Sequence, residues 1–256
     1  MNIGYAILLS TLAGLSTTIG SVIAIFFRRP SGNFMSFFLG FSAGVMILVS
    51  FVELLHQGIT TLGFLPAHIA FFGGMILMFI IDNSIPHEYI AEHKLTESEA
   101  RKKKLARTGL FVALGIAIHN FPEGLATFAG GIMSMKLGIA IAFAIALHNI
   151  PEGISVSVPI YAATGSRKKA FWWSFLAGVA EPIGAIIAAL ILLPFLNATV
   201  LGYVLAAVAG VMVFISIDEL VPVSCSFGES HVSILGFMAG TIVMALSIWM
   251  MGYRIS

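Results

Sequence analysis

The chain has 256 residues, of which 59% are hydrophobic and only 10% are charged, and its formal net charge is +1. Because a soluble domain carries about 25% charged residues, this composition excludes a soluble globular protein and predicts an integral membrane protein. The chain has no soluble basic domain to bind nucleic acid, and its single cysteine, Cys225, excludes an internal disulfide.

Eight apolar segments divide the chain, each near the length of about 20 residues that a helix needs to cross the hydrocarbon layer. Turn-forming residues separate them, as in Arg-Pro-Ser-Gly-Asn after the first segment and Thr-Gly-Ser after the fifth. We therefore predict an all-α integral membrane protein with eight transmembrane helices in a single domain over residues 1–256. The predicted spans are residues 3–27, 34–57, 64–82, 109–130, 136–161, 168–192, 200–221 and 231–253.

Basic residues are distributed unevenly among the connecting segments. Eleven of the 13 lysines and arginines follow the first, third and fifth spans. The positive-inside rule then predicts a multi-pass protein of the cell inner membrane with both termini extracytoplasmic and residues 83–108 in the cytoplasm. For this long connection we favour a solvated charged connector over an extension of the fourth helix.

The fourth and fifth spans each contain the pattern His-Asn-x-Pro-Glu-Gly, at residues 119–124 and again at residues 148–153. Within each copy the histidine and the glutamate lie four residues apart on one helix face, and the asparagine flanks that face. Each histidine lies ten residues or so inside its span, which is about 15 Å of helix and roughly half the hydrocarbon thickness. Ionisable residues at this depth indicate a functional site.

The prolines of the motif, Pro122 and Pro151, cannot donate to the carbonyls four residues earlier and should kink both helices. Backbone oxygen freed in this way is tolerated only beside protein, water or an ion. Ordinary proline kinks capped by buried polar groups are the alternative interpretation. They do not account for two aligned sets of His, Asn and Glu, so we favour a metal site.

Other acidic residues lie inside the apolar spans. Glu181 precedes a proline in the middle of the sixth span, and we assign it to the same site because a charge there needs a partner. Glu53 and His56 share a helix face near the outer end of the second span, where an outer vestibule and interfacial exposure explain them about equally. Asp218 and Glu219 lie toward the inner end of the seventh span. A role as exit-side ligands and a position as solvated acids at the interface explain them about equally.

The residue types narrow the choice of ion without settling it. Imidazole with carboxylate suits zinc and its divalent first-row neighbours, whereas an all-oxygen set would favour magnesium or calcium. Two glutamates neutralise one divalent cation, and no intramembrane thiolate supports a copper(I) carrier. Zinc, iron(II), manganese, cobalt and cadmium all remain candidates.

The doubled motif, together with Tyr-Ala-Ala-Thr-Gly-Ser at residues 161–166, Glu181 and the Asp218-Glu219-Leu220 run, resembles the ZIP family of metal transporters, and most closely one of its bacterial branches. The resemblance covers nearly the whole chain. It implies a 3+2+3 arrangement of the eight helices, in which the first three and the last three are inverted repeats around the fourth and fifth.

The resemblance also implies a binuclear metal site at the membrane midplane and import of zinc, iron(II), manganese and cobalt, to which we add cadmium as a candidate. When the family's ligands are assigned residue by residue to this sequence, the resemblance implies that the two glutamates of the motifs bridge the two ions. One metal would use His119, Glu123, His148 and Glu152, and the other Asn120, Glu123, Asn149, Glu152 and Glu181.

We therefore predict import of divalent cations by alternating access, with the metals as transported substrates and no cofactor. The expected partners are divalent metal ions and the lipid bilayer, and helix faces rich in small residues permit a homodimer. An intramembrane zinc-dependent hydrolase is the alternative. The His-Glu-x-x-His pattern is absent, and the motif prolines break the helical regularity that it needs, so we expect no enzymatic activity.

Overall fold

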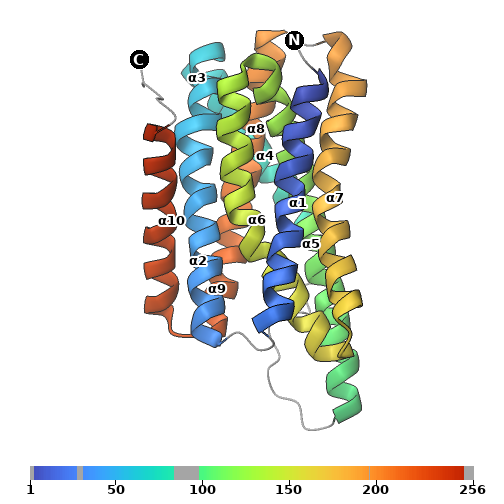
Figure 1. Ribbon diagram of the computed structural model, residues 1–256. Helices are drawn as coiled ribbons and strands as arrows, with labels where there is room; N and C mark the ends of the chain where they lie inside the picture. The colour runs from blue at the N-terminus through green and yellow to red at the C-terminus, as the bar shows by residue number, and fades with distance from the viewer. Residues whose placement is uncertain (1–2, 28–30, 84–97, 196, 251–256) are drawn as a thin grey trace.

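The computed structural model describes residues 3–27, 31–83, 98–195 and 197–250, and every regular element among them is a helix (Figure 1). The elements are α1 (Ile3–Phe27), α2 (Gly32–Val49), η1 (Ser50–Leu55), α3 (His56–Leu62), α4 (Phe64–Asn83), α5 (Ser98–Met133), α6 (Met135–Thr164), α7 (Arg167–Leu192), η2 (Leu193–Phe195), α8 (Ala198–Ile215), η3 (Ser216–Leu220), α9 (Val221–Phe227) and α10 (Ser230–Met250).

Two of the long helical rods contain a π-helical turn. The elements α2, η1 and α3 follow one another from Gly32 to Leu62, and α8, η3 and α9 from Ala198 to Phe227. Counted as rods, the described residues form eight long helices, and seven of these are long and apolar enough to cross a membrane. The eighth, α5, begins in a charged stretch. The predictions of an all-helical fold and of a multi-pass membrane protein are confirmed.

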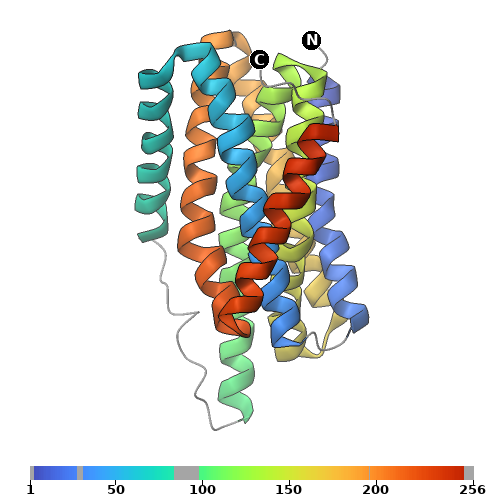
Figure 2. The same ribbon diagram turned by 90° about the vertical axis from the view of Figure 1, so that its left-hand side faces the viewer.

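Helix α5 begins at Ser98 and not near residue 109, where the apolar stretch starts. Its first turns consist mainly of Ala, Glu, Lys and Arg, which are strong helix formers and continue the helix beyond the apolar region. This end of α5 extends past the rest of the bundle in both views (Figures 1 and 2). The preference for a charged connector is therefore wrong for residues 98–108, and residues 84–97 lie outside the described part of the chain.

Local capping chemistry sets the two ends of α6. Ser134 precedes the helix, and its Oγ accepts a hydrogen bond from the Leu137 N–H at 3.1 Å. Gly165 ends the helix with a φ of +64°, a left-handed conformation that favours glycine. The short turns keep α5, α6 and α7 in mutual contact, so that the three helices carrying the predicted ligands lie together (Figure 1).

The helices pack in two groups. In the first, α1, α5, α6 and α7 contact one another, and in the second α2 packs along α10 and α4 along α8. Contacts of α6 with α2 and of α5 with α8 join the two groups. Small residues allow the closest approaches, since Gly14 of α1 lies directly against the Gly178 carbonyl of α7, and Gly44 of α2 against the Phe237 carbonyl of α10.

The outer surface of the bundle is apolar and its interior is partly polar. Phe72 of α4 and Leu235 of α10 are among many large apolar side chains that are more than half exposed. Inside, serine, threonine, asparagine and glutamate side chains are fully buried on α1, α5, α6 and α7. This distribution suits a protein surrounded by lipid, because apolar side chains can face lipid whereas polar ones are placed in the protein interior.

Candidate metal centre

The two copies of the His-Asn-x-Pro-Glu-Gly motif meet where α5 and α6 pack together. Glu123 of α5 and His148 of α6 are both fully buried, and the Nε2 atom of His148 lies 3.1 Å from the Oε1 atom of Glu123. A glutamate of the first motif and a histidine of the second therefore meet between the two helices. Imidazole nitrogen and carboxylate oxygen at this distance are the donor types that divalent transition metals bind.

Two further carboxylates lie close to this pair. Glu152 of α6 and Glu181 of α7 are fully buried. Both are repelled electrostatically by Glu123, and Glu181 also by Glu152. Glu219 of η3 adds to the repulsion on Glu152. A group of buried like charges is strongly unfavourable without a compensating charge, so this interior region favours a cation.

The asparagines of the two motifs connect the centre to the flanking helices. The Nδ2 group of Asn149 donates to the Glu181 Oε2 and to the Ala13 carbonyl, both at 3.0 Å. The Nδ2 group of Asn120 donates to the Ala177 carbonyl at 3.2 Å. Each amide is thereby oriented with its nitrogen toward protein, which leaves its oxygen for another partner.

Several buried polar atoms of the centre make no hydrogen bond within the described part of the structure. Such atoms are rare in folded proteins and indicate a missing partner or a functional role. Nearly all of them are oxygens, and one is an imidazole nitrogen, so the set fits the donor chemistry of a divalent cation. They are Asn120 Oδ1, Glu123 Oε2, His148 Nδ1, Asn149 Oδ1, both carboxylate oxygens of Glu152, and Glu181 Oε1.

Not every predicted ligand can be placed. The backbone of His119 lies in α5, but its side chain is outside the described part of the structure. Among the side chains that are described, no three His, Cys, Asp or Glu residues converge as a complete ligand set. The structure thus brings together two pairs, Glu123 with His148 and Asn149 with Glu181, with Glu152 in electrostatic range of both glutamates.

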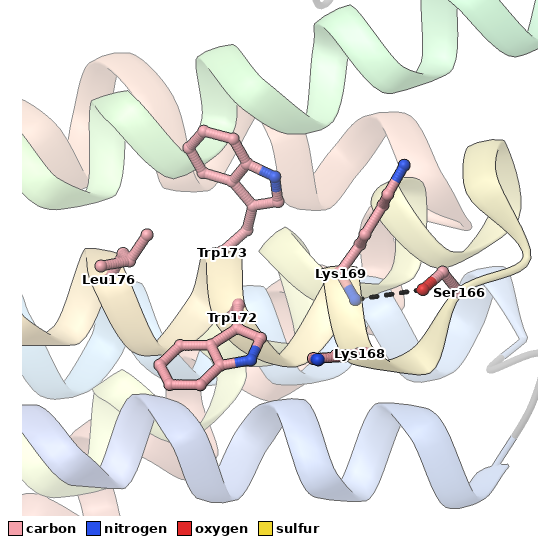
Figure 3. A pocket seen from close by; sticks show the side chains of 6 residues that line it. All are labelled: Ser166, Lys168, Lys169, Trp172, Trp173 and Leu176. Atoms are coloured by element: carbon pink, nitrogen blue, oxygen red, sulfur yellow. Dashed lines mark hydrogen bonds between the residues drawn. The ribbon is translucent and has the colours of Figure 1, made fainter.

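The start of α7 locates the centre relative to the membrane surface. Lys168, Lys169, Trp172 and Trp173 line a shallow hollow of about 450 Å³ together with Ser166 and Leu176 (Figure 3). Exposed tryptophans beside lysines are typical of the membrane–water interface. Glu181 lies nine residues beyond Trp172, about 14 Å along the helix and close to half the hydrocarbon thickness. Measured along α7, Glu181 therefore lies about half a hydrocarbon thickness from the level of these tryptophans.

The remaining acids lie in or near the two π-helical turns, which the sequence analysis missed. Glu53 lies in η1 and is fully buried, which argues against simple interfacial exposure, and His56, directly after η1, is half-buried. In η3, Glu219 is half-buried and Asp218 is exposed. π-Helical turns occur frequently at functional sites.

A repeated sequence pattern would have identified these turns. The pattern Ala-Gly-Val-Met-x-x-x-Ser-x-x-Glu-Leu occurs at residues 43–54 and again at residues 209–220. In both copies the serine Oγ donates to the carbonyl four residues earlier, Ser50 to Met46 at 2.7 Å and Ser216 to Met212 at 2.8 Å. A comparison of the first and last thirds of the chain with each other would have found it.

A bundle of membrane-length helices around buried carboxylates, amides and an imidazole defines a class, that of polytopic membrane proteins with a cation-binding interior. Comparison with known proteins narrows the class to one family. A family model described as ZIP zinc transporter matches residues 82–248, and the chain belongs to this family.

Relatives from several bacteria match over nearly the full chain, and each is described as a zinc transporter ZupT, which is the bacterial branch that the motifs resemble. The relative from Corynebacterium aurimucosum is 49% identical over 96% of this chain and 97% of its own length. Those from Streptococcus mutans and Chlorobium phaeovibrioides are 51% and 52% identical, each over 95% of this chain and 96% of their own. The family consists of transporters and not of enzymes, which agrees with the expected lack of enzymatic activity.

Proposed function

We propose that this protein imports divalent transition-metal cations into the cytoplasm through the buried centre on α5, α6 and α7. The observation that carries the proposal is the fully buried pair of Glu123 and His148, 3.1 Å apart, with Glu152 and Glu181 beside it. Zinc is the first candidate because the relatives are described as zinc transporters. Iron(II), manganese, cobalt and cadmium suit the same donors.

The proposed centre holds two ions that share two carboxylates. The buried oxygens without hydrogen bonds on Glu123 and Glu152 support a bridging role, and the amide oxygens of both asparagines support a second, oxygen-rich position. One ion is bound by His119, Glu123, His148 and Glu152, and the other by Asn120, Glu123, Asn149, Glu152 and Glu181.

The proposed architecture is a 3+2+3 arrangement with inverted repeats. Two equivalent contacts, each between a glycine and a backbone carbonyl, support it. Gly44 lies directly against the Phe237 carbonyl, and Gly210 directly against the Phe71 carbonyl. Gly44 and Gly210 are 166 residues apart in the sequence, and so are Phe71 and Phe237. The equivalent contact is therefore made once by α2 with α10 and once by α8 with α4.

Import is proposed with both termini outside, so that the basic starts of α5 and α7 face the cytoplasm. The beginning of α1 and the end of α10 lie at one end of the bundle, and the start of α5 lies at the other (Figure 1). Moving two positive charges inward across 100 mV releases about 4.6 kcal/mol, twice the value for one charge. This is enough to drive net uptake if the charge moves uncompensated, whereas proton exchange through the glutamates would reduce the gain.

Uptake by purified protein in liposomes tests the proposal. With an imposed negative inside potential, zinc should accumulate, and Glu152→Ala should abolish accumulation because it removes a bridging carboxylate. Glu229→Ala is the matched control, since Glu229 is exposed in the turn before α10. Undiminished zinc uptake by a correctly inserted Glu152→Ala variant would contradict the proposal, as would absence of divalent metal uptake by the unmodified protein.

A further inference from the structure

Helix α1 carries a buried threonine, Thr17, that packs against Gly153 of α6 and Gly178 of α7, although the sequence analysis assigned no ligand to this helix. Thr17 is fully buried, and its Oγ1 atom makes no hydrogen bond with the described residues. Its backbone has a clear packing role, because its carbonyl accepts a hydrogen bond from Ser174 Oγ at 3.0 Å and lies directly against Gly153 of α6. The buried hydroxyl has no such explanation.

The contacts of α1 with the motif helices are repeated by α7 at a spacing of 164 residues. The Thr17 carbonyl lies against Gly153, the glycine of the second motif, and the Glu181 carbonyl lies against Gly124, the glycine of the first. Thr17 and Glu181 are 164 residues apart. The backbone of Thr17 therefore relates to α6 as the backbone of Glu181 relates to α5.

Contacts between α1 and α7 show the same correspondence for the side chains. A Cβ atom on Gly14 would lie 3.1 Å from the Glu181 Cβ, and a Cβ atom on Gly178 would lie 3.2 Å from the Thr17 Cβ. Gly14 and Gly178 are also 164 residues apart and lie directly against each other's carbonyls. The side chains of Thr17 and Glu181 thus leave their helices at equivalent positions.

The two asparagines complete the correspondence. Asn149 donates to the Ala13 carbonyl and to Glu181, whereas Asn120 donates to the Ala177 carbonyl, and Ala13 and Ala177 are again 164 residues apart. By this correspondence, the position of Thr17 on α1 relative to Asn120 is equivalent to that of Glu181 on α7 relative to Asn149. The Oδ1 atom of Asn120 is buried without a hydrogen bond, like the Thr17 hydroxyl.

We propose that Thr17 contributes a neutral hydroxyl oxygen to the coordination shell of the transported cation, on the Asn120 side of the centre. Glu181 contributes a charged oxygen at the equivalent position on the Asn149 side. This inference rests on the proposed transport function and adds α1 to the helices that contact the ion. A hydroxyl adds an oxygen donor without adding to the charge of Glu123, Glu152 and Glu181, which favours release of the ion after it has bound.

The first experiment removes the hydroxyl while preserving the shape of the side chain. In zinc and manganese uptake by liposomes, Thr17→Val should raise the KM for zinc about tenfold, the lower end of the effect of removing a supporting metal contact. It should also lower manganese uptake relative to zinc, because manganese prefers oxygen donors. Thr17→Ser keeps the hydroxyl and should recover most of the loss.

Thr18→Val is the matched control. Thr18 is the next residue of α1, its Oγ1 atom is also buried without a hydrogen bond, and its counterpart 164 residues later is Pro182, which is no ligand. This variant should keep the KM and the manganese-to-zinc ratio of the unmodified protein. If Thr17→Val left the KM for zinc and the manganese-to-zinc uptake ratio unchanged, the inference would be overturned, because that result is expected if Thr17 has only a structural role.

A second experiment exchanges the two side chains and does not depend on the valine variant being correctly inserted. Glu181→Thr should weaken zinc binding, measured as the zinc-dependent rise in thermal stability of the purified protein. Adding Thr17→Glu to that variant restores a carboxylate at the equivalent position and should restore part of the binding. Zinc binding by the double variant no stronger than by Glu181→Thr alone would overturn the inference.

Failure of this inference is distinguishable from failure of the proposed function. If the unmodified protein transports zinc and Glu152→Ala does not, the transport function is upheld whatever the Thr17 variants do. If the unmodified protein neither binds nor transports divalent cations, the proposed function fails and the role of Thr17 fails with it.

Discussion

The two rods that contain π-helical turns share a sequence pattern but differ in exposure. In η1 Glu53 is fully buried, whereas in η3 Glu219 is half-buried and lies in electrostatic range of Glu152. The α3 end of one rod and the α9 end of the other lie at opposite ends of the bundle (Figure 1). The structure therefore buries the acid toward one end of the bundle fully and the equivalent acid toward the other end only in part.

This difference shows what a repeated sequence can and cannot impose. The same residues form a π-helical turn in both rods, and in each the serine hydroxyl donates to the carbonyl four residues earlier. Outside its own rod, η1 contacts both α8 and α4, whereas η3 mainly contacts α2. The repeated sequence thus determines the local helix geometry, whereas the packing of neighbouring helices determines how exposed each acid is.

The largest effect is expected where the equivalent glycines bring helices into contact. Gly44→Val and Gly210→Val each place a branched side chain against a carbonyl, that of Phe237 or of Phe71. Because backbone cannot yield as a flexible side chain does, we expect each to cost roughly 1–3 kcal/mol of stability. The thermal unfolding midpoint of purified protein measures this.

Gly73→Val is the control, since a side chain there meets nothing within 4 Å. Equal midpoints for all three variants would disprove the contacts.

A smaller effect, and the most direct test of the difference in exposure, is chemical labelling. In a Cys225→Ser background, Glu219→Cys should react with a small water-soluble thiol reagent at least several times faster than Glu53→Cys, because Glu219 is half-buried and Glu53 fully buried. Labelling rates in oriented membrane vesicles measure this. Equal rates for the two cysteines would show that the two ends of the bundle do not differ in access.

The smallest effect is expected at the serines of the two π-helical turns. Ser50→Ala and Ser216→Ala each remove one buried hydrogen bond, and we expect each to cost about 0.5–1.5 kcal/mol, nearly equally. Ser226→Ala removes an exposed hydrogen bond and serves as the control. Thermal unfolding midpoints again measure the outcome, and a loss at only one of the two buried serines would mean that the turns are not equivalent.

Much of the fold and half of the centre follow from sequence patterns. The apolar segments predicted α1 and α7 nearly to the residue, because hydrocarbon thickness sets a minimum length for a spanning helix. The doubled motif predicted one polar site shared by the fourth and fifth spans, and Glu123 and His148 of these spans do lie together. The start of α5 was missed because its charged residues are as compatible with a helix as with a solvated connector.

The sequence by itself determined that this is a multi-pass membrane protein with imidazole, amide and carboxylate groups deep in its spans, because composition and spacing along a helix are local properties. Only the tertiary structure decided that Asn149 turns to Glu181, that Glu53 is shielded, and that Thr17 of α1 is equivalent to Glu181 of α7. These facts depend on which helices are neighbours and at what height they meet. Contacts between glycines and carbonyls far apart in the chain set both, and no local pattern encodes them.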